Sequence, residues 1–123
     1  PAVHPHPTVD VAIGRCADRL VATAIPQPGG GVGWSTHLEA LRPLLGFSHG
    51  VSGIAVALAA AAAHTGRATY ARVAAEALSY ERGCYDPTIR NWPDLRANDG
   101  PRPSNRGMLA WCHGAVGVAL ARV

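Results

Sequence analysis

Two histidines of this chain, His49 and His113, stand in the same short motif, His-Gly-x-x-Gly-aliphatic-Ala. The second copy is directly preceded by a cysteine, Cys112. A motif that returns along a chain indicates a repeated supersecondary unit, which buries its apolar face only against its neighbours. Equivalent positions of two such units would face one shared cavity. An imidazole and a thiol in one cavity could transfer protons and bind a metal ion.

His49 lies between turn glycines, just before a predicted helix that begins at Val51. A helix N-terminus carries roughly half a positive charge, which disfavours imidazolium and keeps the ring neutral near neutral pH. A neutral imidazole can accept a proton and return it, as general acid–base catalysis requires. The residues alone leave a second interpretation open, in which His49 only hydrogen-bonds a loop carbonyl.

Cys112 stands at the start of the last predicted helix, between Trp111 and His113. The helix dipole favours thiolate there, and thiolate is the form that binds metal. A single cysteine makes an incomplete zinc site, because zinc takes about three or four protein ligands. His113 would reach the same ion only with a special backbone conformation. By themselves these residues favour a buried structural cysteine.

The apolar periodicity predicts an all-α fold, in which helices are joined by long loops. Residues 1–8 are a Pro/His-rich, irregular lead-in, and an amphipathic helix follows from Val9 to about Ile25. The Pro/Gly-rich run 26–31 stops this helix, and a loop that carries Trp34 comes next.

Residues 51–64 predict an Ala-rich helix that is apolar on nearly all sides, as is typical of a helix buried among other helices. Gly66 is expected to close it as a left-handed cap. A second helix, 69–84, has one apolar face, and the polar loop 85–104 leads to a third buried helix from Met108. The alternation of buried and exposed helices is typical of a toroid with inner and outer helical layers.

The composition limits the classes of function. Of the 123 residues, 48% are hydrophobic, which is enough for a packed domain. The net charge of +3 rests on scattered arginines without any lysine, so nucleic acid is not an expected partner. Three widely spaced cysteines indicate no disulfide framework and a cytoplasmic location, with Cys16 in the core. No apolar stretch is long enough for stable membrane insertion.

The ends of the chain predict a fragment of a longer protein. The chain begins without methionine and stops within the apolar run of the second repeat. A helix that short is marginal in water when isolated. We expect residues 9–123 to form part of one domain whose C-terminal part is missing. Helices cut from a closed ring expose apolar edges, which would favour self-association.

Several short segments follow one another in a characteristic order: Gly46-Phe47-Ser48-His49-Gly50, Gly53-Ile54-Ala55, Tyr80-Glu81-Arg82, Asp86-Pro87, Asn91-Trp92-Pro93-Asp94-Leu95-Arg96, and Trp111-Cys112-His113-Gly114 with Gly117. In this order the chain resembles the lanthionine synthetase C-like cyclase family, most closely the C-terminal cyclase domain of bifunctional class II lanthipeptide synthetases. The resemblance runs from about Leu20 to the end. Trp-Cys-His-Gly alone is moderately specific, and the Asn-Trp-Pro-Asp-Leu-Arg segment between the two glycine motifs makes the match strong.

The resemblance implies an α/α toroid whose active site holds one Zn²⁺ ion. In this family a cysteine of the Trp-Cys motif binds the zinc, together with ligands from a later Cys-His-Gly or Cys-Cys-Gly motif. The zinc binds a cysteine thiol of the dehydrated precursor peptide and lowers the pKa of that thiol. The thiolate then adds to a dehydroalanine or dehydrobutyrine. A thioether (lanthionine) ring results when the enolate is protonated.

By the same resemblance, Cys112 matches the first zinc ligand, and His49 matches the histidine that serves as acid and base. His113 stands where stand-alone cyclases often carry tyrosine; it is expected to line the site without binding metal, and it is the second candidate catalytic residue. Met108 replaces an arginine of the stand-alone cyclases, and Val116 replaces a usual proline. The later motif with the remaining ligands does not occur, so these residues alone should not hold zinc tightly.

Two other functions remain open at this point. The chain could be a catalytically inactive helical fragment that at most binds a peptide. A glycoside-processing toroid would need two carboxylates across a cleft, and Asp86 and Asp94 are the nearest candidates. We otherwise expect Asp94 and Arg96 to form a solvated pair, with contact to the peptide as the alternative. Trp34 and Trp92 are expected to be loop anchors.

Overall fold

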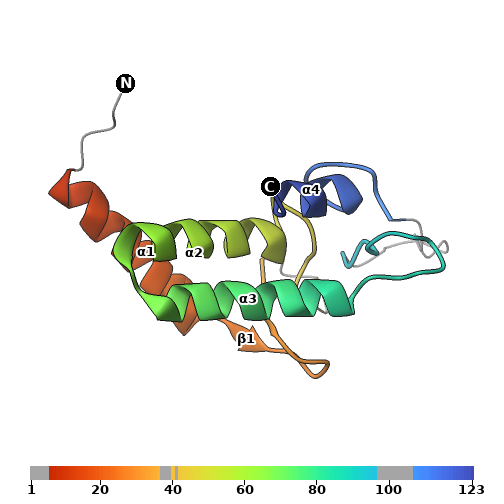
Figure 1. Cartoon of the computed structure of the whole chain (residues 1–123). Helices are drawn as coiled ribbons and strands as arrows, with labels where there is room; N and C mark the ends of the chain where they lie inside the picture. The colour runs from red at the N-terminus through yellow and green to blue at the C-terminus, as the bar shows by residue number, and fades with distance from the viewer. Residues whose placement is uncertain (1–5, 37–39, 41, 97–106) are drawn as a thin grey trace.

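The computed structural model describes residues 6–36, 40, 42–96 and 107–123. Its elements are α1 (Pro7–Ala22), β1 (Ile25–Pro26), β2 (Val32–Gly33), α2 (Val51–Thr65), α3 (Ala68–Gly83) and α4 (Ala115–Leu120) (Figure 1). In this part of the chain, a two-stranded antiparallel hairpin is the only sheet. The prediction of an all-α fold is therefore confirmed, and the arrangement is consistent with a segment of an α/α toroid.

Helix α1 begins two residues before the predicted start. Pro7 occupies the first turn, where a missing N–H costs nothing, and the His6 ring accepts a hydrogen bond from the Thr8 N–H at 3.3 Å. The predicted lead-in is therefore wrong for residues 7 and 8, whereas His6 precedes the helix, and residues 1–5 lie outside the described residues. The helix ends at Ala22, because the following segment forms β1 and pairs Ile25 with Gly33.

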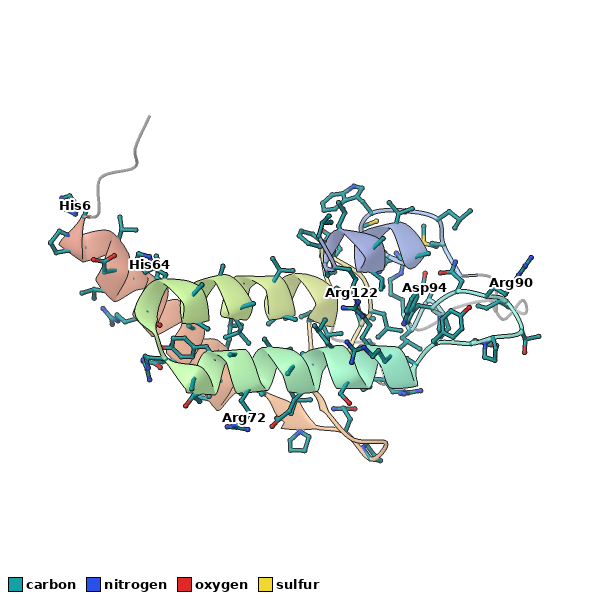
Figure 2. All side chains as sticks on the ribbon, in the orientation of Figure 1. His6, His64, Arg72, Arg90, Asp94 and Arg122 are labelled. Carbon is teal, nitrogen blue, oxygen red and sulfur yellow. The ribbon has the colours of Figure 1, made fainter. Side chains whose placement is uncertain are left out.

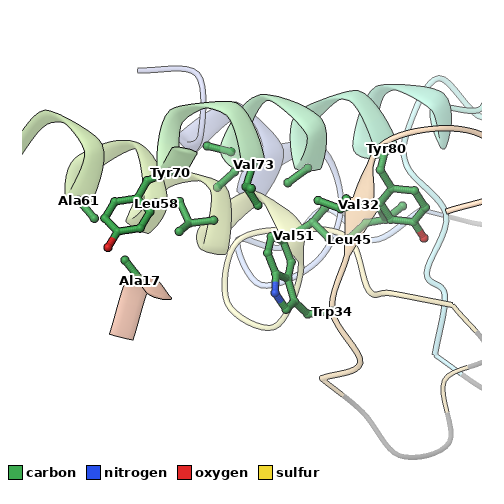
Figure 3. Close-up of a cluster of buried hydrophobic side chains, with 13 residues drawn as sticks. Ala17, Val32, Trp34, Leu45, Val51, Leu58, Ala61, Tyr70, Val73 and Tyr80 are labelled. Carbon is green, nitrogen blue, oxygen red and sulfur yellow. The ribbon is translucent and has the colours of Figure 1, made fainter. Parts of the chain in front are cut away.

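Helices α2 and α3 pack side by side as an antiparallel pair (Figure 1). Their observed bounds agree with the prediction to within about one residue, and Gly66 has the expected left-handed conformation with φ 71°. The two helices, α1 and the loops after β2 share one core, drawn in Figure 3. Full burial of a leucine or valine side chain contributes about 1.5–3 kcal/mol. The labelled core residues are Ala17, Val32, Trp34, Leu45, Val51, Leu58, Ala61, Tyr70, Val73 and Tyr80.

The predicted burial of α2 on all sides is wrong for this chain. Val51, Ala55 and Leu58 are buried, but Val56 is 36% exposed and Ala60 is also exposed. Among the described elements, α1 and α3 pack against α2 and cover only part of its circumference. The single apolar face of α3, by contrast, is buried as predicted.

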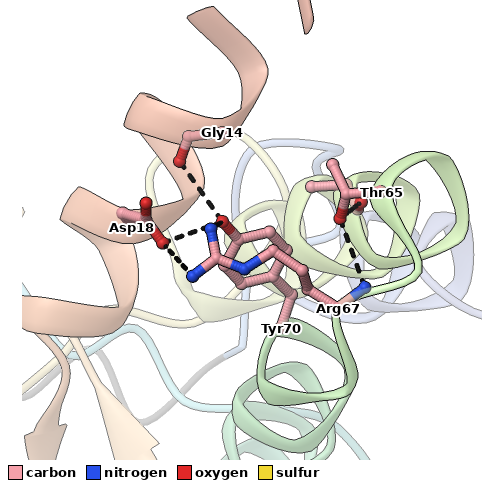
Figure 4. A network of polar contacts seen from close by, with 6 residues as sticks. Gly14, Asp18, Thr65, Arg67 and Tyr70 are labelled. Atoms are coloured by element: carbon pink, nitrogen blue, oxygen red, sulfur yellow. Dashed lines mark hydrogen bonds and ion pairs between the residues drawn. The ribbon is translucent and has the colours of Figure 1, made fainter. Parts of the chain in front are cut away.

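A polar network fixes α1 against the start of α3 (Figure 4). The Tyr70 hydroxyl donates to Asp18 Oδ1 at 2.8 Å, and Arg67 Nη2 lies 2.8 Å from the same oxygen. Hydrogen bonds from Arg67 and then Tyr70 hold the pKa of Asp18 below its ordinary value. Asp18 and Arg67 are about half exposed, so water screens this pair and it orients α1 more than it stabilises the fold.

Two tryptophans anchor loops to helices, as predicted. Trp34 is buried, and its indole N–H donates to the carbonyl of Leu20 at 2.8 Å. The indole N–H of Trp92 donates to the carbonyl of Glu81 at 2.8 Å. Cys16 corrects another prediction: it is exposed, because its neighbour Ala17 is the α1 residue that faces the core.

Helix α4 begins at Ala115 and not near Met108 as predicted. Residues 109 and 114 form an isolated antiparallel bridge, and the Ala110 N–H donates to the carbonyl of His113 at 3.2 Å. This tight turn consumes the residues that the apolar pattern assigns to a helix. Within α4 only Gly117 and Val118 are buried, so the expected third buried helix is short and half-exposed.

Candidate functional site

The two histidine motifs meet where α2 and α4 begin. His49 directly precedes Gly50, the N-cap of α2, and His113 directly precedes Gly114, the N-cap of α4. Figure 1 shows α4 beside the N-terminal end of α2. Segments that are far apart in the sequence therefore present equivalent positions to each other, as the repeated motif predicts.

The loops that carry the histidines touch through their backbones. Gly46 has φ 96°, and a Cβ atom built on it would lie 2.5 Å from the carbonyl oxygen of Cys112. A Cβ atom on Gly117 would lie 2.9 Å from the backbone nitrogen of Phe47. Any side chain at these two positions would push the loops apart, so the contact requires glycine.

The two imidazole rings are stacked. Their centroids lie 5.7 Å apart and their planes are inclined by 25°. His113 is only 6% exposed, whereas His49 is exposed. Burial, and next the nearby Arg96 guanidinium, lower the pKa of His113 from its ordinary value. The buried ring is therefore mainly neutral near pH 7, which leaves it able to accept a proton.

All three predicted site residues line one cavity of about 290 Å³, which we call the His–Cys pocket. A larger hollow of about 510 Å³ adjoins it at His49 and Thr36. Part of the wall of that hollow is Trp111, which is 56% exposed. The lining of the His–Cys pocket consists of Thr36, Leu44, His49, Arg96, Met108, Cys112 and His113.

Arg96 lines this pocket and pairs with Asp94; the sequence did not predict this place for the pair. Arg96 Nε donates to both carboxylate oxygens of Asp94, at 2.9 and 3.1 Å, and the Arg96 backbone N–H donates to Oδ1 at 3.1 Å. The side chain of Asp94 is 8% exposed, so the predicted pairing is confirmed but its solvated character is wrong. Hydrogen bonds from Arg96 lower the pKa of Asp94 in spite of its burial.

Asn91 connects the same loop to the start of α4. Its side-chain oxygen accepts from the Ala115 N–H at 2.9 Å, and its side-chain nitrogen donates to the carbonyl of Met108 at 3.3 Å. Sequence reasoning did not single out this buried residue, although its place in the Asn-Trp-Pro-Asp-Leu-Arg segment was a usable signal. Asn91 therefore ties the loop of Arg96 to the loop of Cys112.

The residues of the pocket do not by themselves fit a zinc ion. Cys112 is a free, half-buried thiol and could supply one ligand. Within residues 6–36, 40, 42–96 and 107–123, no group of three His, Cys, Asp or Glu side chains is placed to hold a metal. Zinc takes about three or four protein ligands, so the described residues provide an incomplete site.

The surroundings of the two carboxylates considered for glycoside chemistry do not favour that reaction. Asp86 pairs with Asn91 through the backbone, and its side chain accepts from the Thr88 N–H at 2.7 Å. Asp94 is held ionised by Arg96 and is a poor proton donor.

No helix in the described part of the chain is long and apolar enough to cross a membrane.

A family model described as lanthionine synthetase C-like protein matches residues 13–123 of the chain. No curated protein and no solved structure gave a match. The match spans α1 to α4 and therefore includes the whole His–Cys pocket.

Substitution of Gly46 by alanine should destabilise the fold and open the His–Cys pocket. We expect a loss of about 2–6 kcal/mol, from about 1–3 for the positive φ and about 1–3 for the overlap with Cys112. Chemical denaturation measures this loss in the free energy of unfolding. Gly30→Ala is the matched control, because Gly30 also has a positive φ, of 93°, and nothing lies within 4 Å of a Cβ atom there. Equal stability of the two variants would contradict the backbone contact between the loops.

Asp94→Asn should weaken the fold in a pH-dependent way. The folded pKa of Asp94 lies below its unfolded value of about 3.9, so the ionised carboxylate stabilises the fold above that pH. This contribution disappears as the pH falls through the folded pKa. We expect the variant to lose about 1–2 kcal/mol at pH 7, allowing for the partial exposure of Arg96. Denaturation at pH 7 and pH 3 should show the difference shrinking; a constant difference would contradict it.

Proposed function

The chain belongs to the lanthionine synthetase C-like family, and on that premise we propose that it is part of a zinc-dependent lanthipeptide cyclase. Its substrate would be a dehydrated precursor peptide, and its product a thioether ring. The observation that carries the proposal is the His–Cys pocket, in which His49, Cys112 and His113 meet. More specifically, we propose that it is the C-terminal cyclase domain of a class II synthetase. We also propose that it acts in the cytoplasm, where its free cysteines stay reduced.

The proposed reaction needs one proton to be moved twice. A base removes the proton of a peptide cysteine, and the sulfur adds its electron pair to the β-carbon of a dehydroalanine or dehydrobutyrine. The carbon–carbon π pair shifts toward the carbonyl and gives an enolate, which takes a proton at the α-carbon. His49 is the exposed imidazole of the pocket and can carry the proton from sulfur to carbon. His113 is stacked on it and supports its orientation.

Zinc, when bound, would lower the pKa of the substrate thiol. We assign Cys112 as one ligand of the complete zinc site. Because the described residues offer no group of three ligands, the remaining ones would come from residues outside the described part. A role limited to peptide binding is the alternative that the following experiments also test.

Cys112→Ala in the complete gene product should abolish ring formation and lower the zinc content. The expected result follows from the loss of a thiolate ligand. The assay supplies a dehydrated peptide, blocks unreacted thiols with an alkylating reagent and counts the adducts by mass spectrometry; metal analysis gives the zinc per protein. Cys16→Ala is the matched control, because Cys16 is exposed on α1 and does not line the pocket. Full cyclisation by Cys112→Ala would refute the metal role.

His49→Gln should slow ring closure by about 10²–10⁴-fold, the usual contribution of a general acid–base group, and leave dehydration of the peptide unchanged. The same adduct assay, followed over time, measures the rate. His64→Gln is the control, since His64 is exposed at the opposite end of α2 and pairs with Asp10 (Figure 2). If both variants cyclise the peptide at the wild-type rate, His49 is not the proton carrier.

A further inference from the structure

We propose that Arg96 is the oxyanion-binding residue of the His–Cys pocket. Its guanidinium would donate a hydrogen bond to the carbonyl oxygen of the dehydroamino acid, where negative charge collects as the carbon–sulfur bond forms. This assignment rests on the proposed function and adds a group that contacts the reacting part of the peptide. The assignment of Arg96 also predicts one feature of the substrate, namely that the acceptor alkene is conjugated to a carbonyl.

The position of the guanidinium is fixed by its neighbours. Asp94 accepts from Arg96 Nε at 2.9 and 3.1 Å and also from Nη2. Arg96 Nη2 further donates to the sulfur of Met108 at 3.1 Å. Asp94 itself is almost completely buried, and Figure 2 shows it below α4 among the side chains of the loop after α3. A donor held this way needs little reorganisation when charge develops, which is the condition for strong transition-state stabilisation.

The Arg96 side chain is part of the wall of the His–Cys pocket. It keeps 40% of its surface exposed and shares this wall with His49, Cys112 and His113. Among the described residues of this wall, Arg96 is the only one with a permanent positive charge. An anionic oxygen formed in the pocket would therefore be drawn to Arg96.

The electron balance of the step fits this role. The sulfur lone pair becomes the new carbon–sulfur bond, the alkene π pair moves between the α-carbon and the carbonyl carbon, and the carbonyl π pair moves onto oxygen. Arg96 keeps its own protons, because hydrogen bonding to Asp94 raises its pKa further. It stabilises the oxygen and does not protonate it. The proton that ends at the α-carbon comes from the imidazole.

The test compares Arg96→Ala and Arg96→Lys in the complete gene product, with a dehydrated peptide as substrate. We expect kcat of ring closure to fall by about 10²–10³-fold in Arg96→Ala with KM nearly unchanged, as for loss of one oxyanion donor. Arg96→Lys should recover part of the rate. Added guanidinium chloride at millimolar concentration should partly rescue Arg96→Ala, which a merely structural role for Arg96 would not allow.

Arg72→Ala is the matched control, since Arg72 also pairs with a carboxylate, Glu76 at 2.7 Å, near the opposite end of α3 from the loop of Asp94 (Figure 2). Its kcat should equal the wild-type value. Provided that the wild-type protein closes rings, three results would overturn the inference. They are a wild-type kcat in Arg96→Ala, a change in KM alone, and a loss of rate that neither lysine nor guanidinium rescues. No ring closure by the wild-type protein would refute the proposed function, and this inference with it.

Discussion

The candidate site depends on one steric condition, which is the direct contact between two backbone loops. Gly46 and Gly117 lie at this contact, and neither position has room for a Cβ atom. Because the loops touch through main chain, the side chains of His49 and His113, which begin the two motifs, lie close together. The stacked imidazoles and the half-buried thiol are consequences of this approach. Gly117, which belongs to the repeated motif, thus meets a packing requirement beside the two candidate site histidines.

The first turns of α2 and α4 must also stay close together. Two adjacent residues of α3, Tyr80 and Glu81, hold them there. The Tyr80 hydroxyl donates to the carbonyl of Pro43 at 2.8 Å, next to the loop of Gly46. The fully buried carboxylate of Glu81 accepts hydrogen bonds from Ser52 at the start of α2 and from Arg122 just after α4. A buried ion pair is weak evidence for stability, since desolvation offsets much of the attraction. Here the Glu81 contacts fix the geometry between α2 and α4, and a candidate site residue lies just before each of these helices.

The sequence predicted the parts of the fold that follow from local periodicity and end signals. The pair α2 and α3 and the cap at Gly66 belong to this group. The meeting of His49 with Cys112 and His113 followed instead from the repeated motif. The β1–β2 hairpin was missed because its strands are too short to show alternation. The late start of α4 was missed because a turn with backbone hydrogen bonds overrides an apolar pattern. The burial of Asp94 depends on loops that are distant in sequence, and no local pattern contains that information.

The two histidines share a motif but differ in environment, and the proposed function depends on this difference. His113 lies under the loops, where burial lowers its pKa and its position is fixed. His49 lies at the boundary between the His–Cys pocket and the larger hollow, so it is reachable from solvent. A group that receives a proton from one peptide side chain and delivers it to another must be accessible to both. The exposed member of the stack meets this requirement and the buried member does not. The repeat therefore places two equivalent histidines in unequal environments, and the proposed reaction would use the exposed imidazole to move the proton and the buried one to support it.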